Sequence, residues 1–141
     1  MLPPVPTLEL FHGQKWHVVG YFQERYGIEL NFDAAALREI DLWVDHHECF
    51  ADDLIIGLAF EWGAMVAACL QRELGGKMLM RLGEPCLEVR PDLLAFPCQL
   101  VEACLRKQPG CRLHQQLMAL SNRLRLQRGN LASGEWTEVA C

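Results

Sequence analysis

The sequence lacks a long uninterrupted hydrophobic run. Its apolar runs, such as Leu54 to Phe60, are far shorter than the roughly 20 apolar residues that a membrane-spanning helix needs. The first ten residues also lack a basic patch followed by an apolar core, so no secretory signal peptide is predicted. We therefore expect a cytoplasmic protein that does not act at a membrane.

The common signatures of catalytic sites are missing as well. The sequence holds no Gly-rich phosphate loop, no GxSxG nucleophile motif, and no HExxH, CxxC or HxH ligand pattern. Each of these motifs places reactive groups or metal ligands at a spacing that one local structure can bring together. Without them, we predict a non-enzymatic protein that needs no cofactor.

An excess of basic charge is also absent. The formal net charge is -5, which argues against a nucleic-acid-binding protein, because phosphate neutralisation needs a basic surface. The charge is divided along the chain, since residues 103–134 contain no acid and residues 29–61 contain Arg38 as their one base. The acids of residues 29–61 are Glu29, Asp33, Glu39, Asp41, Asp45, Glu48, Asp52, Asp53 and Glu61.

The seven cysteines do not indicate a disulfide scaffold. Their number is odd, and Cys69 and Cys104 lie within apolar helical patterns, where a thiol behaves as a small hydrophobic group. Free thiols in a reducing cytoplasm are the simpler interpretation.

The chain contains enough apolar residues to form a packed core. Of 141 residues, 51% are hydrophobic and 22% charged, which is typical of a folded chain, and the length favours one domain, residues 1–141. Apolar spacing predicts a helix between Gly13 and Tyr26 that stops at Gly27, and a second after the N-cap Asp33. A third, residues 53–74, is apolar almost all round, so we expect it at the centre of the domain.

The pattern changes after Gly75-Gly76. Two short runs, 77–82 and 86–90, flank Gly83-Glu84-Pro85 and predict a β-hairpin. Pro97 begins another helix, and a last helix carries a leucine stripe from Leu113 to Leu124. Its arginines are expected on a solvated face. The predicted fold is α+β and mostly helical, with about five helices around helix 53–74, one hairpin near 77–90, an extended lead-in (1–12) and a loose tail (129–141).

The middle of the chain resembles a family of small bacterial domains of unknown function. The resemblance rests on Gly-Leu-Ala-Phe-Glu-Trp-Gly (57–63), Arg-Glu-Leu-Gly-Gly-Lys (72–77), the hairpin, and Phe-Pro-x-x-x-Val (96–101). In those domains a helix with a Gly/aromatic motif leads through a Gly turn into a hairpin and then a Pro-started helix. The resemblance implies this fold and carries no activity.

The densest group of chemically active side chains lies in residues 45–53. Asp45, His46, His47 and Cys49 are all metal-ligand types, and Cys49 is also a candidate nucleophile. Adjacent histidines point about 100° apart on a helix, which opposes a shared metal site. The simpler interpretation is the polar end of one helix, a turn, and the N-terminus of the next, where Asp52 and Asp53 suit the helix dipole.

Glu61 is the one charged residue between Leu54 and Leu70. It shares a helical stripe with Gly57, Ala64 and Ala68, whose small side chains permit another backbone to approach. A carboxylate in such a groove can mark a site. The alternatives are an ion pair with an arginine of the last helix, or simple exposure on a thin polar strip.

These observations favour a bacterial protein-binding module that docks a basic protein partner through its acidic segment. An immunity protein that neutralises a toxin is one such module. The predicted contact residues are Asp41, Asp45, Glu48, Asp52, Asp53 and Glu61. Three alternatives stay open: the acidic segment packs against the basic last helix of its own chain, residues 45–53 form a metal- or thiol-dependent enzyme or sensor, or the chain is a structural homodimer anchored by Trp16 or Trp136.

Overall fold

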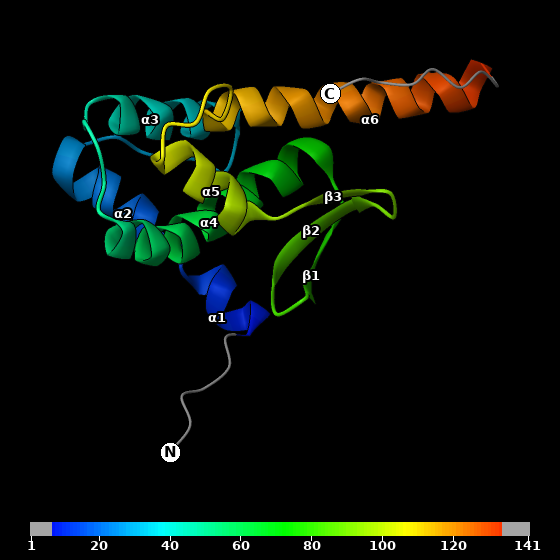
Figure 1. Ribbon diagram of the computed structural model, residues 1–141. Coiled ribbons are helices and arrows are strands. Elements are labelled where there is room, and N and C mark those ends of the chain that lie inside the picture. Colours follow the sequence, from blue (N-terminus) through cyan, green and yellow to red (C-terminus); the bar gives the residue numbers. More distant parts are fainter. Residues whose placement is uncertain (1–6, 134–141) are drawn as a thin grey trace.

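The computed structural model describes the backbone of residues 7–133 and the side chains of residues 7–126. The elements run α1 (Leu8–Gly13), α2 (Lys15–Tyr26), α3 (Ala34–Asp45), α4 (Asp52–Leu74), β1 (Lys77–Arg81), β2 (Glu84–Arg90), β3 (Leu93–Ala95), α5 (Pro97–Leu105) and α6 (Leu113–Ser133). The fold is therefore α+β and mostly helical, as predicted. Figure 1 shows the helices gathered around α4, with the strands at one side.

Helix α4 is the centre of the packing. It contacts α1, α2, α3, α5, α6 and β2. Its buried residues are Ile55, Ala59, Trp62, Gly63, Ala64, Met65, Val66, Ala67, Cys69 and Leu70. The approach of α5 is close, because a Cβ added at Gly63 would lie 3.0 Å from the Sγ of Cys98. The prediction of a central helix over 53–74 is confirmed.

α4 is also the one element in the described part of the chain that is long and apolar enough to cross a membrane. Of its most apolar window, 56% is buried inside the fold. The core helix of a water-soluble protein has this character, so the burial is compatible with a soluble protein.

Local sequence signals account for the helix ends. The side chain of Asp33 accepts a hydrogen bond from the Ala36 N–H at 3.0 Å, which caps α3. Gly27 ends α2 in the left-handed region, at φ 66°, a conformation that glycine adopts without steric cost. Pro97 stands at the first position of α5. All three were predicted, since each depends on a residue type at a fixed offset.

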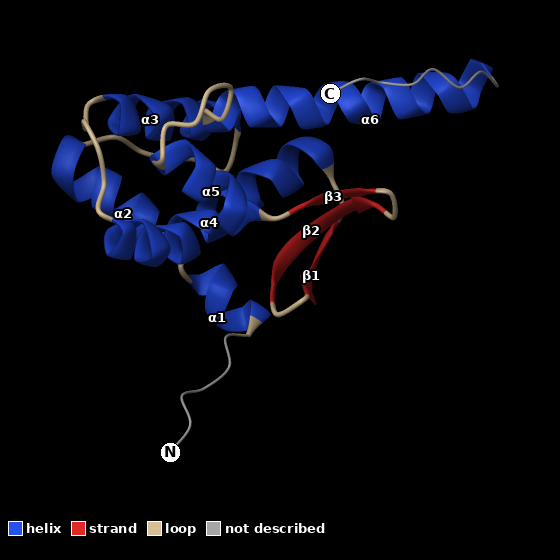
Figure 2. Ribbon diagram, in the orientation of Figure 1, coloured by secondary structure: helices blue, strands red, loops and turns tan. Residues whose placement is uncertain are grey.

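The strands form a three-stranded antiparallel sheet in the order β1-β2-β3 (Figure 2). The predicted hairpin corresponds to β1 and β2, but its turn is Leu82-Gly83, and Glu84 and Pro85 already belong to β2. The third strand was not predicted, because three residues are too few to show an alternating pattern.

Both ends of the chain contain more helix than predicted. The lead-in 1–12 was expected to be extended, but α1 forms there because Thr7 caps it and Phe11 provides a fully buried anchor. Residues 1–6 lie outside the described part. The tail was predicted from residue 129, but α6 continues to Ser133 and reaches past the other elements (Figure 1). The rest of that tail, with Trp136, also lies outside the described residues.

Candidate functional site

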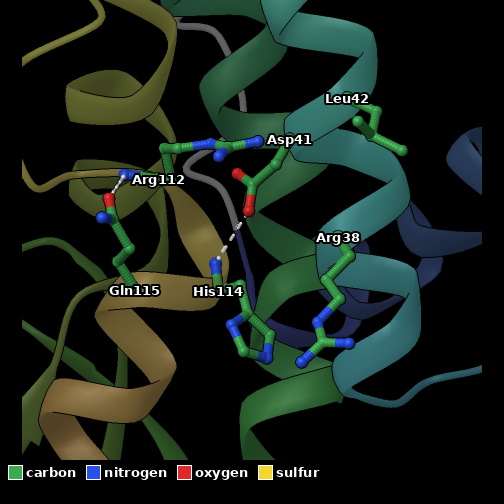
Figure 3. Close-up of a pocket in the computed structure, with 6 residues that line it drawn as sticks. All are labelled: Arg38, Asp41, Leu42, Arg112, His114 and Gln115. Carbon is green, nitrogen blue, oxygen red and sulfur yellow. Dashed lines mark hydrogen bonds between the residues drawn. The ribbon is translucent and has the colours of Figure 1, made fainter.

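Asp41 is a buried capping residue and not part of a binding face. Only 3% of it is exposed, and its carboxylate accepts hydrogen bonds from the backbone N–H groups of Leu113 (2.7 Å) and His114 (3.0 Å). The Cys104 thiol donates to the same carboxylate at 3.6 Å. Figure 3 shows the side chain pointing from α3 to the start of α6. The prediction that Asp41 contacts a partner is wrong, because α6 already uses its oxygens.

Two further acids of the segment form ion pairs with the basic C-terminal part of the chain. Asp45 binds Arg112 at 2.6 Å, and Asp52 binds Arg106 at 2.7 Å. The Lys107 ammonium group also donates a hydrogen bond to the backbone carbonyl of His47. The charge division seen in the sequence is therefore satisfied in part within the molecule, which is the first alternative that the sequence left open.

The other predicted contact residues are Glu48, Asp53 and Glu61. Glu48 and Asp53 are exposed and Glu61 is half-buried. None of the three forms a hydrogen bond or an ion pair through its side chain with another residue that the structure describes. Glu61 therefore has no arginine partner on α6 within the described range. Of the predicted set, these three carboxylates keep their oxygens available to an external group.

The structure does not gather the candidate metal ligands. Within residues 7–126, no group of three or more His, Cys, Asp and Glu side chains is placed to hold one ion. Asp45 is engaged by Arg112, and the Nδ1 atom of His47 lies 2.7 Å from the Trp43 carbonyl oxygen. Within the described residues, the geometry therefore gives no support to a metal site built on Asp45, His46, His47 and Cys49.

Most of the thiols are in apolar surroundings. Burial raises the pKa of Cys69 and of Cys104 to about 12, and the carboxylates of Asp33 and Asp41 add to these two shifts respectively. Burial also raises the pKa of Cys98, to about 11. Cys49, by contrast, is exposed. Thiols that stay protonated at neutral pH are poor nucleophiles, so these buried cysteines serve as packing groups.

The rate of alkylation should distinguish the exposed cysteine from the buried ones. At pH 8, iodoacetamide is expected to label Cys49 within minutes and to leave Cys69 and Cys104 unmodified until the protein is unfolded, because a thiol with a pKa of about 12 is almost entirely protonated there. Peptide mass spectrometry of the native and urea-treated protein provides the measurement. Rapid native labelling of Cys69 or Cys104 would contradict their placement in the core.

A shallow groove lies where α4, the β1–β2 turn and the start of α5 meet. Its volume is about 290 Å³, and the residues that line it are Ile56, Ala59, Phe60, Gly83, Glu84, Pro85, Cys98, Gln99 and Glu102. Ile56 is 66% exposed at its edge. Leu82, which precedes Gly83 in the turn, is 93% exposed. Two large apolar side chains therefore stand in solvent beside an apolar groove.

Leu82 is also held in an uncommon backbone conformation. Its φ is 54°, in the left-handed region where Asn, Asp and Gly are favoured in two-residue hairpin turns. Leu82 was not predicted as a turn residue, because the sequence pattern indicated a turn at Gly83-Glu84-Pro85. A signal was present in the sequence: Leu82-Gly83 is a residue-Gly pair between two short apolar runs, the pattern of a two-residue hairpin turn.

Negative charge surrounds the groove. Glu84 and Glu102 are on its wall, and Asp52 and Asp53 lie one helical turn before Ile56 on α4. Arg106 offsets part of this charge by binding both Asp52 and Glu102, and Arg81 stands opposite Glu84 across the hairpin. These four acids and two bases leave a net charge of -2 (2 − 4) around the groove. A ligand with an apolar side chain and flanking positive charge would complement this surface.

Comparison with known proteins found no family model, no curated protein and no solved structure that matches this chain. The resemblance noted in residues 57–101 therefore stays an observation on those motifs. Any assignment of function has to come from the surface itself.

Proposed function

We propose that the chain is a non-catalytic protein-binding module whose docking surface is the groove between α4, the β1–β2 turn and α5. The observation that carries the proposal is the exposure of Ile56 and Leu82 beside this groove. Apolar side chains clustered in solvent at a rimmed depression are typical of protein interfaces, where a few buried anchors supply most of the binding energy.

The groove suits one class of occupant. At about 290 Å³ it is at the lower limit of small-molecule sites, which measure about 300–1,000 Å³, and it has room for one or two apolar side chains. The surrounding acids favour lysine or arginine next to such an anchor, because complementary charge raises the association rate and selects the partner. The proposed partner is thus a basic protein segment that inserts an apolar residue.

This surface modifies the acidic-face hypothesis. Asp41 is buried, and Asp45, Asp52 and Glu102 are paired internally, so the contact relies on Asp53 and Glu84 around an apolar centre. An immunity protein for a basic cytoplasmic toxin is the specific form of the proposal that the charge pattern favours. It acts by covering the partner's surface and needs no chemistry of its own.

The proposal predicts that Ile56→Glu weakens partner binding by at least about tenfold, because it places a carboxylate against the partner's apolar anchor, where it loses its water. The tagged wild-type chain and the variant are used to capture proteins from the native host, and the recovered partner is purified for a titration by calorimetry. Both proteins are first compared by thermal unfolding, since an exposed residue should tolerate the change.

The matched control is Leu126→Glu, which changes an exposed leucine on α6, away from the groove. Support requires a basic partner that binds the wild type and the control alike and is lost or weakened with Ile56→Glu. If both variants bind the partner as tightly as the wild type, the groove is not the docking surface. If the chain recovers only itself and sediments as a dimer, the proposal of a basic partner is wrong.

A further inference from the structure

A second depression, separate from the groove, lies between α2 and α3. Its volume is about 360 Å³, and the residues that line it are Phe22, Tyr26, Ile28, Glu39, Leu42, Trp43, His46 and His47. Most of these side chains are aromatic or aliphatic. The lining belongs to an aromatic cluster in which Trp43 packs against Tyr21, His47, Phe50 and Trp62. The contacts around Trp43 hold its ring in place, so this part of the wall is preformed.

The hydrogen bonds within the cluster determine what its polar groups can offer. The indole N–H of Trp43 donates to the hydroxyl oxygens of Tyr26 (3.1 Å) and Tyr21 (3.3 Å), so it is already occupied. The Nδ1 atom of His47 lies 2.7 Å from the Trp43 carbonyl oxygen, which can only accept, so Nδ1 carries the hydrogen. In the neutral imidazole, Nε2 of His47 is then an acceptor.

Glu39 adds an acceptor that bears a charge. Its side chain is half-buried at the pocket and has no hydrogen bond or ion pair with any residue between 7 and 126. The neighbouring cation on α3, Arg38, lines a different cavity, the one that holds Asp41 and Arg112 (Figure 3). The pocket therefore combines apolar walls with a carboxylate and an imidazole acceptor, and Arg38 does not neutralise it.

We propose that this pocket binds a small organic ammonium ion that carries an aromatic or branched apolar body. The apolar body replaces water on the faces of Tyr26, Leu42 and Ile28, and the ammonium group donates a hydrogen bond to the Glu39 carboxylate. The exposed ring of Tyr26 contributes a favourable cation–π contact. The inference is independent of the proposed docking groove, with which it shares no lining residue.

The test uses 2-phenylethylamine, which is protonated at neutral pH, and 3-phenylpropionate, an anion of nearly the same shape. Each probe is titrated at millimolar concentration into isotope-labelled protein, and the amide shifts are followed by NMR. The amine is expected to shift the amides of α2 and α3 around Tyr26 and Trp43 with saturation, whereas the carboxylate produces no saturable shift. Quenching of tryptophan fluorescence provides a second readout.

Glu39→Gln keeps the shape of the side chain and removes its charge, so it is expected to weaken amine binding about tenfold. Glu9→Gln, on α1, is the matched control and should bind as the wild type does. Equal affinity of the two probes, or an unchanged affinity in Glu39→Gln, would overturn the proposal, as would shifts that map outside α2 and α3. The thermal unfolding of both variants is recorded first. If Glu39→Gln does not fold, the proposal is tested by comparing the affinities of the amine and the carboxylate for the wild type.

Discussion

Replacing Gly76 with alanine is expected to destabilise the protein by roughly 3 kcal/mol or more, because two costs combine at this position. A Cβ atom there would lie 2.4 Å from the carbonyl oxygen of Glu88 and 2.8 Å from the Cα atom of Val89, both backbone atoms of β2. The φ angle of 98° is also one that alanine rarely adopts. Urea unfolding followed by circular dichroism measures the loss.

Gly27→Ala separates the two costs. Gly27 has a φ of 66°, and a Cβ built on it meets no atom within 4 Å, so only the backbone strain of about 1 kcal/mol is expected. If Gly76→Ala is no more destabilising than Gly27→Ala, Gly76 does not approach Glu88 and Val89 of β2 as closely as the structure places it.

The second large effect is expected from Asp41→Ala, at roughly 2–4 kcal/mol. The substitution removes the acceptor for the N–H groups of Leu113 and His114, and Leu113 is itself buried. A buried donor left without a partner costs its full desolvation free energy, and α6 loses the residue that caps its first turn. The midpoint of urea unfolding at pH 7 should fall accordingly.

Asp45→Ala provides the comparison from the same helix. Asp45 and Arg112 are both about half exposed, so solvent screens their ion pair and its loss should cost under about 1 kcal/mol. Asp41→Asn is expected to lie between the two, since the amide keeps one oxygen for a backbone N–H. Equal destabilisation by Asp41→Ala and Asp45→Ala would show that the carboxylate of Asp41 does not hold α6 in solution.

The helices could be predicted because their signals are local. Asp33, Gly27 and Pro97 act on residues within one turn of themselves, so the sequence alone shows where α3 begins, where α2 ends and where α5 begins. The leucine stripe of the last helix likewise identified the face that packs, and Leu113, Leu117, Leu120 and Leu124 are all buried.

The site could not be predicted in the same way. Asp41 meets Leu113 across 72 residues of sequence, and the charge pattern alone fits an external partner as well as an internal cap. The nearly continuous apolar circumference of α4 predicted a central helix, but Leu54 and Ile56 face solvent. Periodicity shows which apolar side chains lie on the same face of a helix. Only the tertiary arrangement shows which of those faces a neighbouring element covers.

The anchoring of α6 at one end has a consequence for the local stability of the chain. Asp41 caps the first turn, and four leucines of the first half are buried in the core. The second half extends past the other elements (Figure 1). Opening of the first half requires unfolding of the core, whereas a helix end whose backbone extends past the other elements can fray by itself. Amide hydrogens along this one helix should therefore exchange with solvent over a wide range of rates, slowest near Leu117 and fastest toward Ser133. A protease would trim α6 from its far end and stop where the leucines begin.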